Sequence, residues 1–177
     1  MTDHHAHDSG TRFSAGLITV SDKSSRGERE DEGGRILREL VESLGGDVRE
    51  QVVVADEADQ IAAAIREMVD VQHLAAVFTT GGTGLAPRDV TPQATASVID
   101  FEVPGMAEAM RATSLQKTPA AMLSRALVGV RGRALIVNLP GNPKAVLECL
   151  EVIAPALGHA LDTLAAQVGE HDRPTTH

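Results

Sequence analysis

The segment from Thr79 to Thr91 has the residue types that bind a phosphate or a polar heterocycle. It reads Thr-Thr-Gly-Gly-Thr-Gly-Leu-Ala-Pro-Arg-Asp-Val-Thr and continues directly from an apolar run. Its glycines let the backbone approach a ligand closely, and the exposed N–H groups of such a turn suit an anion. Neither the Gly-Lys-Ser/Thr of a phosphate-binding P-loop nor the third glycine of the dinucleotide fingerprint is present. Taken alone, the segment could equally be a turn that needs glycine only for its geometry.

Two carboxylates accompany this loop. Asp89 lies within it, and Asp56 follows the end of a neighbouring predicted strand. Mg²⁺ binds through one or two carboxylates, keeps several waters and bridges to substrate phosphates, so this pair suits a magnesium site. Two other interpretations stay open from spacing alone: Asp56 could cap a helix, and Asp89 could pair with Arg88.

Basic residues near the same predicted loops could hold anionic groups, although each could also be a solvated surface charge. They are Lys23, Arg26, Arg88, Lys117, Arg125 and Lys144. The chain as a whole has a net charge of −9, and its three Phe are scattered with no Tyr or Trp. Extended nucleic-acid binding needs a basic face or stacking aromatics, so we exclude it. The local basic residues still allow a site that binds polyanions.

The hydrophobic pattern of the first half predicts parallel strands that alternate with helices. Apolar runs predict strands at 15–20, 48–55 and 74–79, and helical spacing predicts helices from Asp31 to about residue 44 and over 56–69. Thr91-Pro92 predicts a further helix with Thr91 as its N-cap. Such a chain forms an α/β fold with helices on both faces of the sheet. Ligands of such sheets bind beyond the carboxyl ends of the strands, where the glycine-rich loop, Asp56 and the segments 21–31 and 140–144 would lie.

The second half predicts an antiparallel addition to the sheet. A turn at 103–105 and helices at 106–113 and 118–125 precede two apolar runs, 126–130 and 133–138, which form a hairpin around Arg131-Gly132. Asn142 then caps a final helix that begins at Pro143, ends near residue 166 and is kinked at Pro155.

Composition and length predict a single soluble domain over 13–166, with disordered tails at 1–12 and 167–177. No uninterrupted apolar run reaches the roughly 18 to 20 residues of a membrane span, so we expect a cytoplasmic protein. The single cysteine, Cys149, lies on an apolar helix face and is expected to be a buried, inert thiol. His73 and His159 have no partner at the spacing of a zinc site.

Several motifs together resemble the MogA/MoaB family of molybdenum cofactor biosynthesis, to which the gephyrin G domain is similar. They occur in one order between about Phe13 and Leu164: Ser21 to Gly27 with Asp31 and Gly33, Thr79 to Thr91, Val103-Pro104-Gly105, Leu123-Ser124-Arg125, and Asn138 to Lys144. The resemblance implies a three-layer molybdopterin-binding α/β fold with a mostly parallel sheet. It also implies a homotrimer that adenylylates molybdopterin with Mg-ATP and releases pyrophosphate, with a molybdate insertase as a candidate partner.

The same resemblance assigns roles to individual positions. Asp56 and Asp89 match the two essential acidic positions, which we expect to hold Mg²⁺ and to be catalytic. Ser124 and Asn138 match positions that contact the pterin or its phosphate. The remaining expected ligand-binding positions are Ser21, Asp22, Gly81, Gly82, Thr83, Gly84, Pro140, Gly141 and Lys144.

Two alternatives to this enzyme remain. The first is a non-catalytic trimer that carries molybdopterin or serves as an interaction paralogue. The second is a molybdate-inserting enzyme with the same pterin-binding domain, although such chains have additional domains for which 177 residues leave no room. Release of pyrophosphate that depends on both molybdopterin and Mg²⁺ would separate the enzyme from the carrier.

Overall fold

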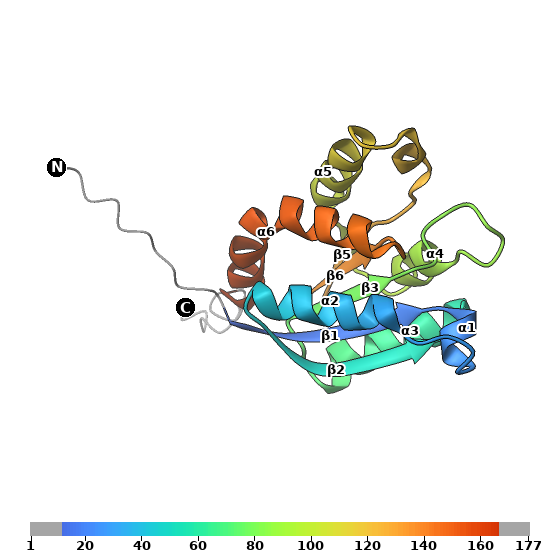
Figure 1. Cartoon of the computed structure of the whole chain (residues 1–177). Helices are drawn as coiled ribbons and strands as arrows, with labels where there is room; N and C mark the ends of the chain where they lie inside the picture. Colours follow the sequence, from blue (N-terminus) through green and yellow to red (C-terminus); the bar gives the residue numbers. More distant parts are fainter. Residues whose placement is uncertain (1–11, 167–177) are drawn as a thin grey trace, which may run out of the picture.

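The computed structural model describes residues 12–166, so apart from Arg12 both predicted tails lie outside the described residues. In chain order the elements are β1 (Phe13–Val20), α1 (Asp22–Ser25), α2 (Glu32–Ser43), β2 (Gly46–Val54), α3 (Ala58–Arg66), the π-helix η1 (Glu67–Val71), β3 (Ala76–Thr80), α4 (Thr91–Ala96), β4 (Phe101–Glu102), α5 (Pro104–Leu115), the 3-10 helix η2 (Pro119–Leu123), β5 (Val128–Arg131), β6 (Ala134–Leu139) and α6 (Pro143–Ala166). Figure 1 shows their arrangement around one sheet.

The sheet has the order β2-β1-β3-β6-β5-β4. Its first four strands are parallel, and β5 and β4 add an antiparallel edge. This confirms the predicted mostly parallel sheet with its antiparallel hairpin. The chain leaves β1 toward β2 on one side and later returns to β3 on the other, so the strand order reverses at β1. Open α/β sheets bind ligands at such a reversal, outside the carboxyl ends of the strands.

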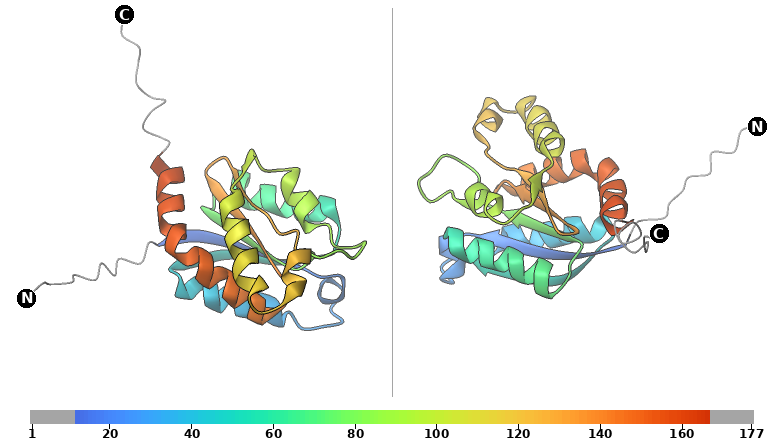
Figure 2. Two further views of the ribbon diagram at one scale, coloured as in Figure 1. Left: turned by 90° about the horizontal axis from the view of Figure 1, so that it is seen from above. Right: turned by 180° about the vertical axis from the view of Figure 1, so that it is seen from behind.

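Helices pack on both faces of the sheet, as predicted. One core joins the sheet to α2, α5 and α6, and the other joins it to α3, η1 and α4, which lie on the side turned away in Figure 1 and are seen from behind in Figure 2. Adjacent strand residues divide between the two cores: Leu17 and Phe78 enter the first, and Ile18 and Val77 enter the second. Strands buried on both faces must be apolar at every position, which explains their continuous apolar runs.

Most predicted elements are present, with their ends moved by one to three residues. The predicted helix over 56–69 is instead the α-helix α3 followed by η1. The predicted helix over 118–125 is the shorter 3-10 helix η2. The predicted turn at 103–105 was wrong, because Pro104 is the first residue of α5, where its missing N–H is not needed. Two short elements, α1 and β4, were not predicted.

The hairpin and the start of α4 also differ from the predictions. Arg131 pairs with Ala134, so the two turn residues are Gly132 and Arg133 rather than Arg131 and Gly132. Gly132 has φ +56, as the tight turns of hairpins require. Thr91 is not an N-cap: it is the first residue of α4, and its hydroxyl donates a hydrogen bond to the carbonyl of Gly81.

The last helix, α6, begins as predicted. The Oδ1 atom of Asn142 accepts hydrogen bonds from the N–H groups of Lys144 and Ala145, which makes Asn142 the cap. The helix runs through Pro155 and changes direction along its length (Figure 2).

By length and hydropathy α6 could span a membrane, since one 18-residue window has a mean hydropathy of 1.2. The search for an uninterrupted apolar run did not detect this helix, because charged residues interrupt its apolar residues. The mean hydropathy of a window can be high despite such interruptions. In the fold, α6 places an apolar face in the first core, and 33% of that window is buried inside the structure.

Candidate active site

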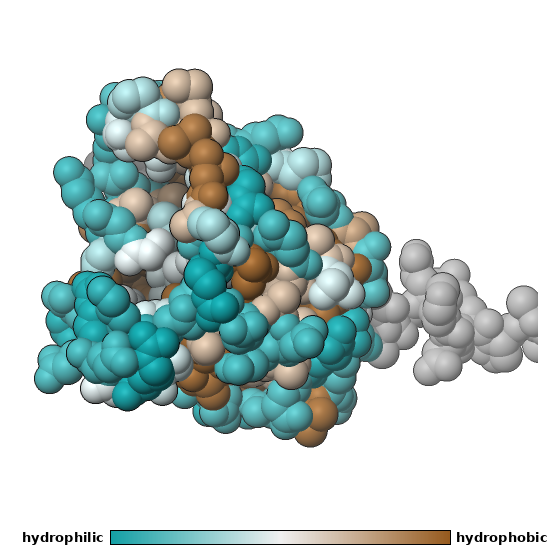
Figure 3. All heavy atoms as spheres, turned by 90° about the vertical axis from the view of Figure 1, so that its right-hand side faces the viewer, coloured by the Kyte–Doolittle hydropathy of each residue, from teal (hydrophilic) through white to brown (hydrophobic). Residues whose placement is uncertain are grey.

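Loops after four parallel strands meet at one end of the sheet. They comprise residues 21–31 after β1, 55–57 after β2, 81–90 after β3 and 140–142 after β6. Two hydrogen bonds hold the glycine-rich loop against the end of β6. The N–H of Gly81 donates to the carbonyl of Leu139, and the hydroxyl of Thr80 donates to the carbonyl of Pro140. Figure 3 views the molecule from this end, where hydrophilic side chains surround a recess beneath the lobe formed by α5 and η2.

The first two glycines of the loop are required by its geometry. Gly81 and Gly82 have φ +99 and +67, which side chains rarely allow. A Cβ on Gly81 would collide with the carbonyl oxygen of Val20, and one on Gly82 would collide with the hydroxyl of Thr91. The geometric interpretation of the loop therefore holds at these positions. It leaves the ligand-binding interpretation open, because a close backbone turn serves both.

Asp56 is held at the end of β2 by a reciprocal pair of hydrogen bonds with Asp22. The N–H of Asp22 donates to Oδ2 of Asp56 at 2.8 Å, and the N–H of Asp56 donates to Oδ1 of Asp22 at 3.0 Å. The alternative that Asp56 caps its helix is wrong, since the N-cap of α3 is Glu57 and no side chain caps it. Asp56 instead joins the carboxyl ends of β1 and β2.

Arg88 fixes this pair from the glycine-rich loop. Its Nε and Nη2 atoms donate to the two oxygens of Asp22 at 3.0 and 2.9 Å, and its Nη1 donates to Glu57 at 2.9 Å. The guanidinium lowers the pKa of Asp22, chiefly through these hydrogen bonds. The alternative that Arg88 pairs with Asp89 is therefore wrong. Arg88 is occupied within the chain, so it is not the free cation that the sequence suggested.

The two predicted metal ligands lie beside the same short stretch of the loop. A Cβ added to Gly82 would lie 3.4 Å from Oδ1 of Asp56, and one added to Gly84 would lie 2.8 Å from Oδ2 of Asp89. Each carboxylate uses only one oxygen in a hydrogen bond: Oδ2 of Asp56 accepts from Asp22, and Oδ2 of Asp89 accepts from the N–H of Ala86. Within residues 12–166 the other oxygen of each has no donor, so both can bind a cation.

The charges around Asp56 also fit a cation. Burial, with the nearby negative charges of Asp22 and Asp89, raises the pKa of Asp56. Repulsion between nearby carboxylates is relieved when a cation binds. The described residues contain no cluster of three or more His, Cys, Asp or Glu that could hold a metal. Two carboxylates with free coordination positions suit Mg²⁺, which completes its octahedron with water and phosphate oxygens.

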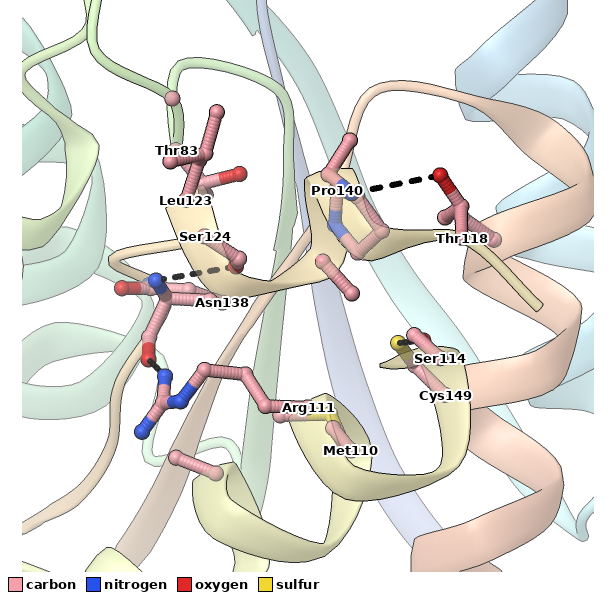
Figure 4. Close-up of a pocket in the computed structure, with 16 residues that line it drawn as sticks. Thr83, Met110, Arg111, Ser114, Thr118, Leu123, Ser124, Asn138, Pro140 and Cys149 are labelled. Atoms are coloured by element: carbon pink, nitrogen blue, oxygen red, sulfur yellow. Dashed lines mark hydrogen bonds between the residues drawn. The ribbon is translucent and has the colours of Figure 1, made fainter. Parts of the chain in front are cut away.

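A cavity of about 260 Å³ with mainly apolar walls lies between the loop, α5, η2 and the start of α6 (Figure 4). Five predicted ligand-binding residues line it: Thr83, Gly84, Ser124, Asn138 and Pro140. Arg111, which the sequence did not indicate, also lines the cavity and donates from Nη1 to the carbonyl of Ala126 at 2.7 Å. Cys149 is in the wall with its sulfur 4.0 Å from the Ser114 hydroxyl. Burial raises the pKa of its thiol, in agreement with an inert cysteine.

Asn138 has a structural role that the sequence did not reveal. It is fully buried, and its Nδ2 atom donates to the hydroxyls of Thr79 and Thr95 at 3.1 and 2.9 Å. Its Oδ1 atom accepts a longer bond from the N–H of Leu127. Asn138 therefore joins β3, α4 and β6 behind the cavity, and a contact with a ligand stays a prediction.

A second, smaller cavity of about 180 Å³ lies on the other side of the glycine-rich loop. Ser21, Gly81 and Gly141 line it, together with the start of α2. The predicted positions thus divide between two cavities that share one loop. Asp22, Gly82 and Lys144 line neither of the two, and neither do the two predicted metal ligands, Asp56 and Asp89.

Comparison with known proteins identifies the family. A family model described as "Probable molybdopterin binding domain" matches residues 16–159. A molybdopterin adenylyltransferase of Helicobacter pylori is 42% identical over 151 residues, which cover 84% of this chain and 86% of that protein. The chain belongs to the MogA/MoaB family of molybdenum cofactor biosynthesis. The molybdenum cofactor synthesis protein cinnamon of Drosophila melanogaster is 40% identical over 86% of this chain, which covers 26% of that longer protein. The structure of the molybdopterin biosynthesis enzyme MoaB from Thermus thermophilus is 49% identical with a TM-score of 0.81, covering 86% of this chain and 96% of that one.

In this MogA/MoaB protein the predicted basic residues are mostly paired within the chain. Arg26 pairs with Glu28, and Lys117 pairs with the nearly buried Glu148 at 2.8 Å. Arg125 donates to backbone carbonyls of the glycine-rich loop. Of the six predicted cations, Lys23 and Lys144 alone form no ion pair and no side-chain hydrogen bond within residues 12–166. The charge available to an anionic ligand is therefore smaller than the sequence suggested, which increases the importance of a bound cation.

Proposed function

We propose that this member of the MogA/MoaB family transfers the adenylyl group of ATP to molybdopterin, with Mg²⁺, and releases pyrophosphate. The observation that carries the proposal is the position of Asp56 and Asp89. Two carboxylates with free oxygens lie against a glycine-rich loop whose Thr80 and Gly81 line one cavity and whose Thr83 and Gly84 line another. A transfer between two bound phosphate compounds needs this arrangement, because both substrates must reach one charged centre.

The larger cavity suits the pterin. Its walls are mainly apolar and carry a few hydroxyl groups, such as those of Thr83 and Ser124, that could orient a polar heterocycle. The smaller cavity, beside Ser21 and Gly81, is left for the phosphates of ATP. Without Tyr or Trp, both ligands would be held by backbone amides, aliphatic groups and hydroxyls rather than by broad stacking.

In the reaction, an oxygen of the terminal phosphate of molybdopterin attacks the α-phosphorus of ATP. The new O–P bond forms as the bond to pyrophosphate breaks. The attacking phosphate is already ionised at neutral pH, so the protein needs no general base. Asp56 and Asp89 would hold Mg²⁺, which neutralises phosphate charge. The chain itself positions the reactants: Asp22 and Arg88 fix Asp56, and the N–H groups of the loop are available to orient phosphate oxygens.

The resemblance also supports a homotrimer in the cytoplasm, with a molybdate insertase as partner for the product. These remain proposals, which size measurements, localisation and co-purification would test separately.

The test compares Asp56→Asn and Asp89→Asn with wild type, and uses Asp47→Asn as the control. Asp47 is an exposed acid that pairs with Arg49 at the opposite end of β2. Pyrophosphate release is measured with molybdopterin, ATP and Mg²⁺, and molybdopterin binding is measured separately. We expect each site variant to lose about 100-fold or more in turnover, while binding changes by only a few-fold.

Near-normal turnover in both site variants would refute the roles of the two aspartates. A wild-type protein that binds molybdopterin but releases no pyrophosphate would instead be the non-catalytic carrier.

A further inference from the structure

Arg125 contacts the glycine-rich loop at three places. Its backbone N–H donates to the carbonyl of Thr83 at 2.9 Å. Its side chain donates from Nε to the carbonyl of Gly84 at 2.7 Å and from Nη2 to the carbonyl of Asp89. One guanidinium therefore binds the backbone on both sides of the loop tip, residues 85–88.

The tip itself has few other attachments. All four of its residues are exposed, and Arg88 is its connection to Asp22 and Glu57. The carboxylate of Asp89 bonds only within the loop, to the N–H of Ala86. Among the described residues, the guanidinium of Arg125 is the side chain from outside the loop that holds the backbone of Asp89.

Arg125 also belongs to the wall of the larger cavity through its neighbours. Ser124 and Ala126 line that cavity, and Arg111 of α5 holds the carbonyl of Ala126. The segment 124–126 is thus fixed to α5 on one side and to the loop on the other. Because this segment is itself held in place, its hydrogen bonds restrict the motion of the loop.

We propose that Arg125 is a positioning residue for adenylyl transfer: its planar fork closes the base of the loop and places the carboxylate of Asp89. This rests on the proposed function. It differs from the expectation drawn from sequence, in which Arg125 is a cation that binds substrate phosphate. The two roles differ in what the side chain contacts: a positioning guanidinium spans two backbone carbonyls and its loss lowers kcat, whereas a substrate-binding guanidinium contacts the phosphate and its loss raises KM.

The decisive variant is Arg125→Lys, which keeps the charge and removes the fork. Arg125→Ala removes both, and Arg49→Lys makes the same change at an exposed arginine at the far end of β2. We expect Arg125→Lys to lower kcat by about 10- to 100-fold, as a displaced catalytic group does, while KM for molybdopterin and for ATP stays within about threefold. We expect Arg125→Ala to recover part of its kcat with added guanidinium ion and none with ammonium ion.

A measurement without metal or substrate tests the positioning directly. Amide hydrogen exchange of the segment 84–89 should become faster in Arg125→Lys and Arg125→Ala than in wild type and in Arg49→Lys. Because no turnover is involved, this result does not depend on the proposed reaction.

The outcomes separate the two proposals. If wild type releases no pyrophosphate, the proposed function fails, and the exchange measurement alone decides whether Arg125 holds the loop. Near-normal kcat in Arg125→Lys with a raised KM in Arg125→Ala would overturn the proposal in favour of anion binding. Unchanged exchange at 84–89 would also overturn it. If Arg125→Ala does not fold, Arg125→Lys still decides.

Discussion

Three glycine-to-alanine variants separate backbone strain from steric contact at the candidate site. Gly81 has φ +99, and its added Cβ would lie closer than 3.0 Å to the carbonyl oxygen of Val20, a separation that real Cβ atoms do not show. Gly27 has a similarly positive φ of +71, but an added Cβ would have nothing within 4 Å. Gly105, near the start of α5, has neither a positive φ nor a neighbour within that distance. Gly81 thus differs from Gly27 in steric contact, and Gly27 differs from Gly105 in backbone conformation.

The expected effects follow from these contacts. Gly27→Ala should lower the free energy of unfolding by about 1–2 kcal/mol, because a left-handed backbone disfavours a Cβ. Gly81→Ala should lose about 2–5 kcal/mol, since backbone oxygen cannot rotate away as a flexible side chain could, and overpacking adds about 1–3 kcal/mol. Gly105→Ala should be neutral or stabilised by up to about 1 kcal/mol, because alanine favours a helix.

Unfolding in urea, followed by far-ultraviolet circular dichroism, measures these differences. The chain has no Trp or Tyr, so intrinsic fluorescence offers little signal. One protein concentration must be used throughout, because association would add to the apparent stability. A loss in Gly81→Ala no larger than that in Gly27→Ala would refute the reasoning, since contact with Val20 would then not restrict this position.

Three further variants test the site and its surroundings by stability. Burial raises the pKa of Asp56 above its ordinary 3.8, so ionised Asp56 destabilises the fold at neutral pH, and this loss disappears as the pH falls through the folded-state pKa. At pH 7, Asp56→Asn should therefore have a higher free energy of unfolding than wild type, and this difference should narrow toward pH 4. A difference that instead widens toward pH 4, measured by unfolding in urea, would contradict this. Asn138→Ala should lose about 2–4 kcal/mol, because it removes the buried amide that bridges Thr79, Thr95 and Leu127. The exposed cap variant Asn142→Ala should lose about 1 kcal/mol, and an equal loss in the two would show that the buried network is unimportant.

The sequence predicted the fold because its strands are buried on both faces. Continuous apolar runs such as 15–20 and 74–79 mark central parallel strands, and helical spacing between them leaves little choice of topology. The elements that were missed are those with little pattern. Phe101–Glu102 is too short for an alternation to show, and α1 has four polar residues with none buried.

The composition of the candidate site was easier to predict than its connections. Which loops meet follows from the direction of the strands, so Asp56 and Asp89 could be brought together from sequence. The partner of an arginine depends on distances across the fold. Arg88 lies within the glycine-rich loop, yet its guanidinium bonds to Asp22, 66 residues earlier. No local signal distinguishes such an arginine from one exposed to solvent, and the same holds for the guanidinium of Arg125.

The direction of the sheet also determines how this domain can be combined with others. Residue 12 leads into the amino end of β1, and residue 166 ends α6 at the same side of the molecule, opposite the loops of the candidate site (Figure 1). A polypeptide joined at either point would leave that site open. The unit is therefore suited to fusion within larger proteins, and the Drosophila relative, of which this chain covers 26%, is such a longer protein.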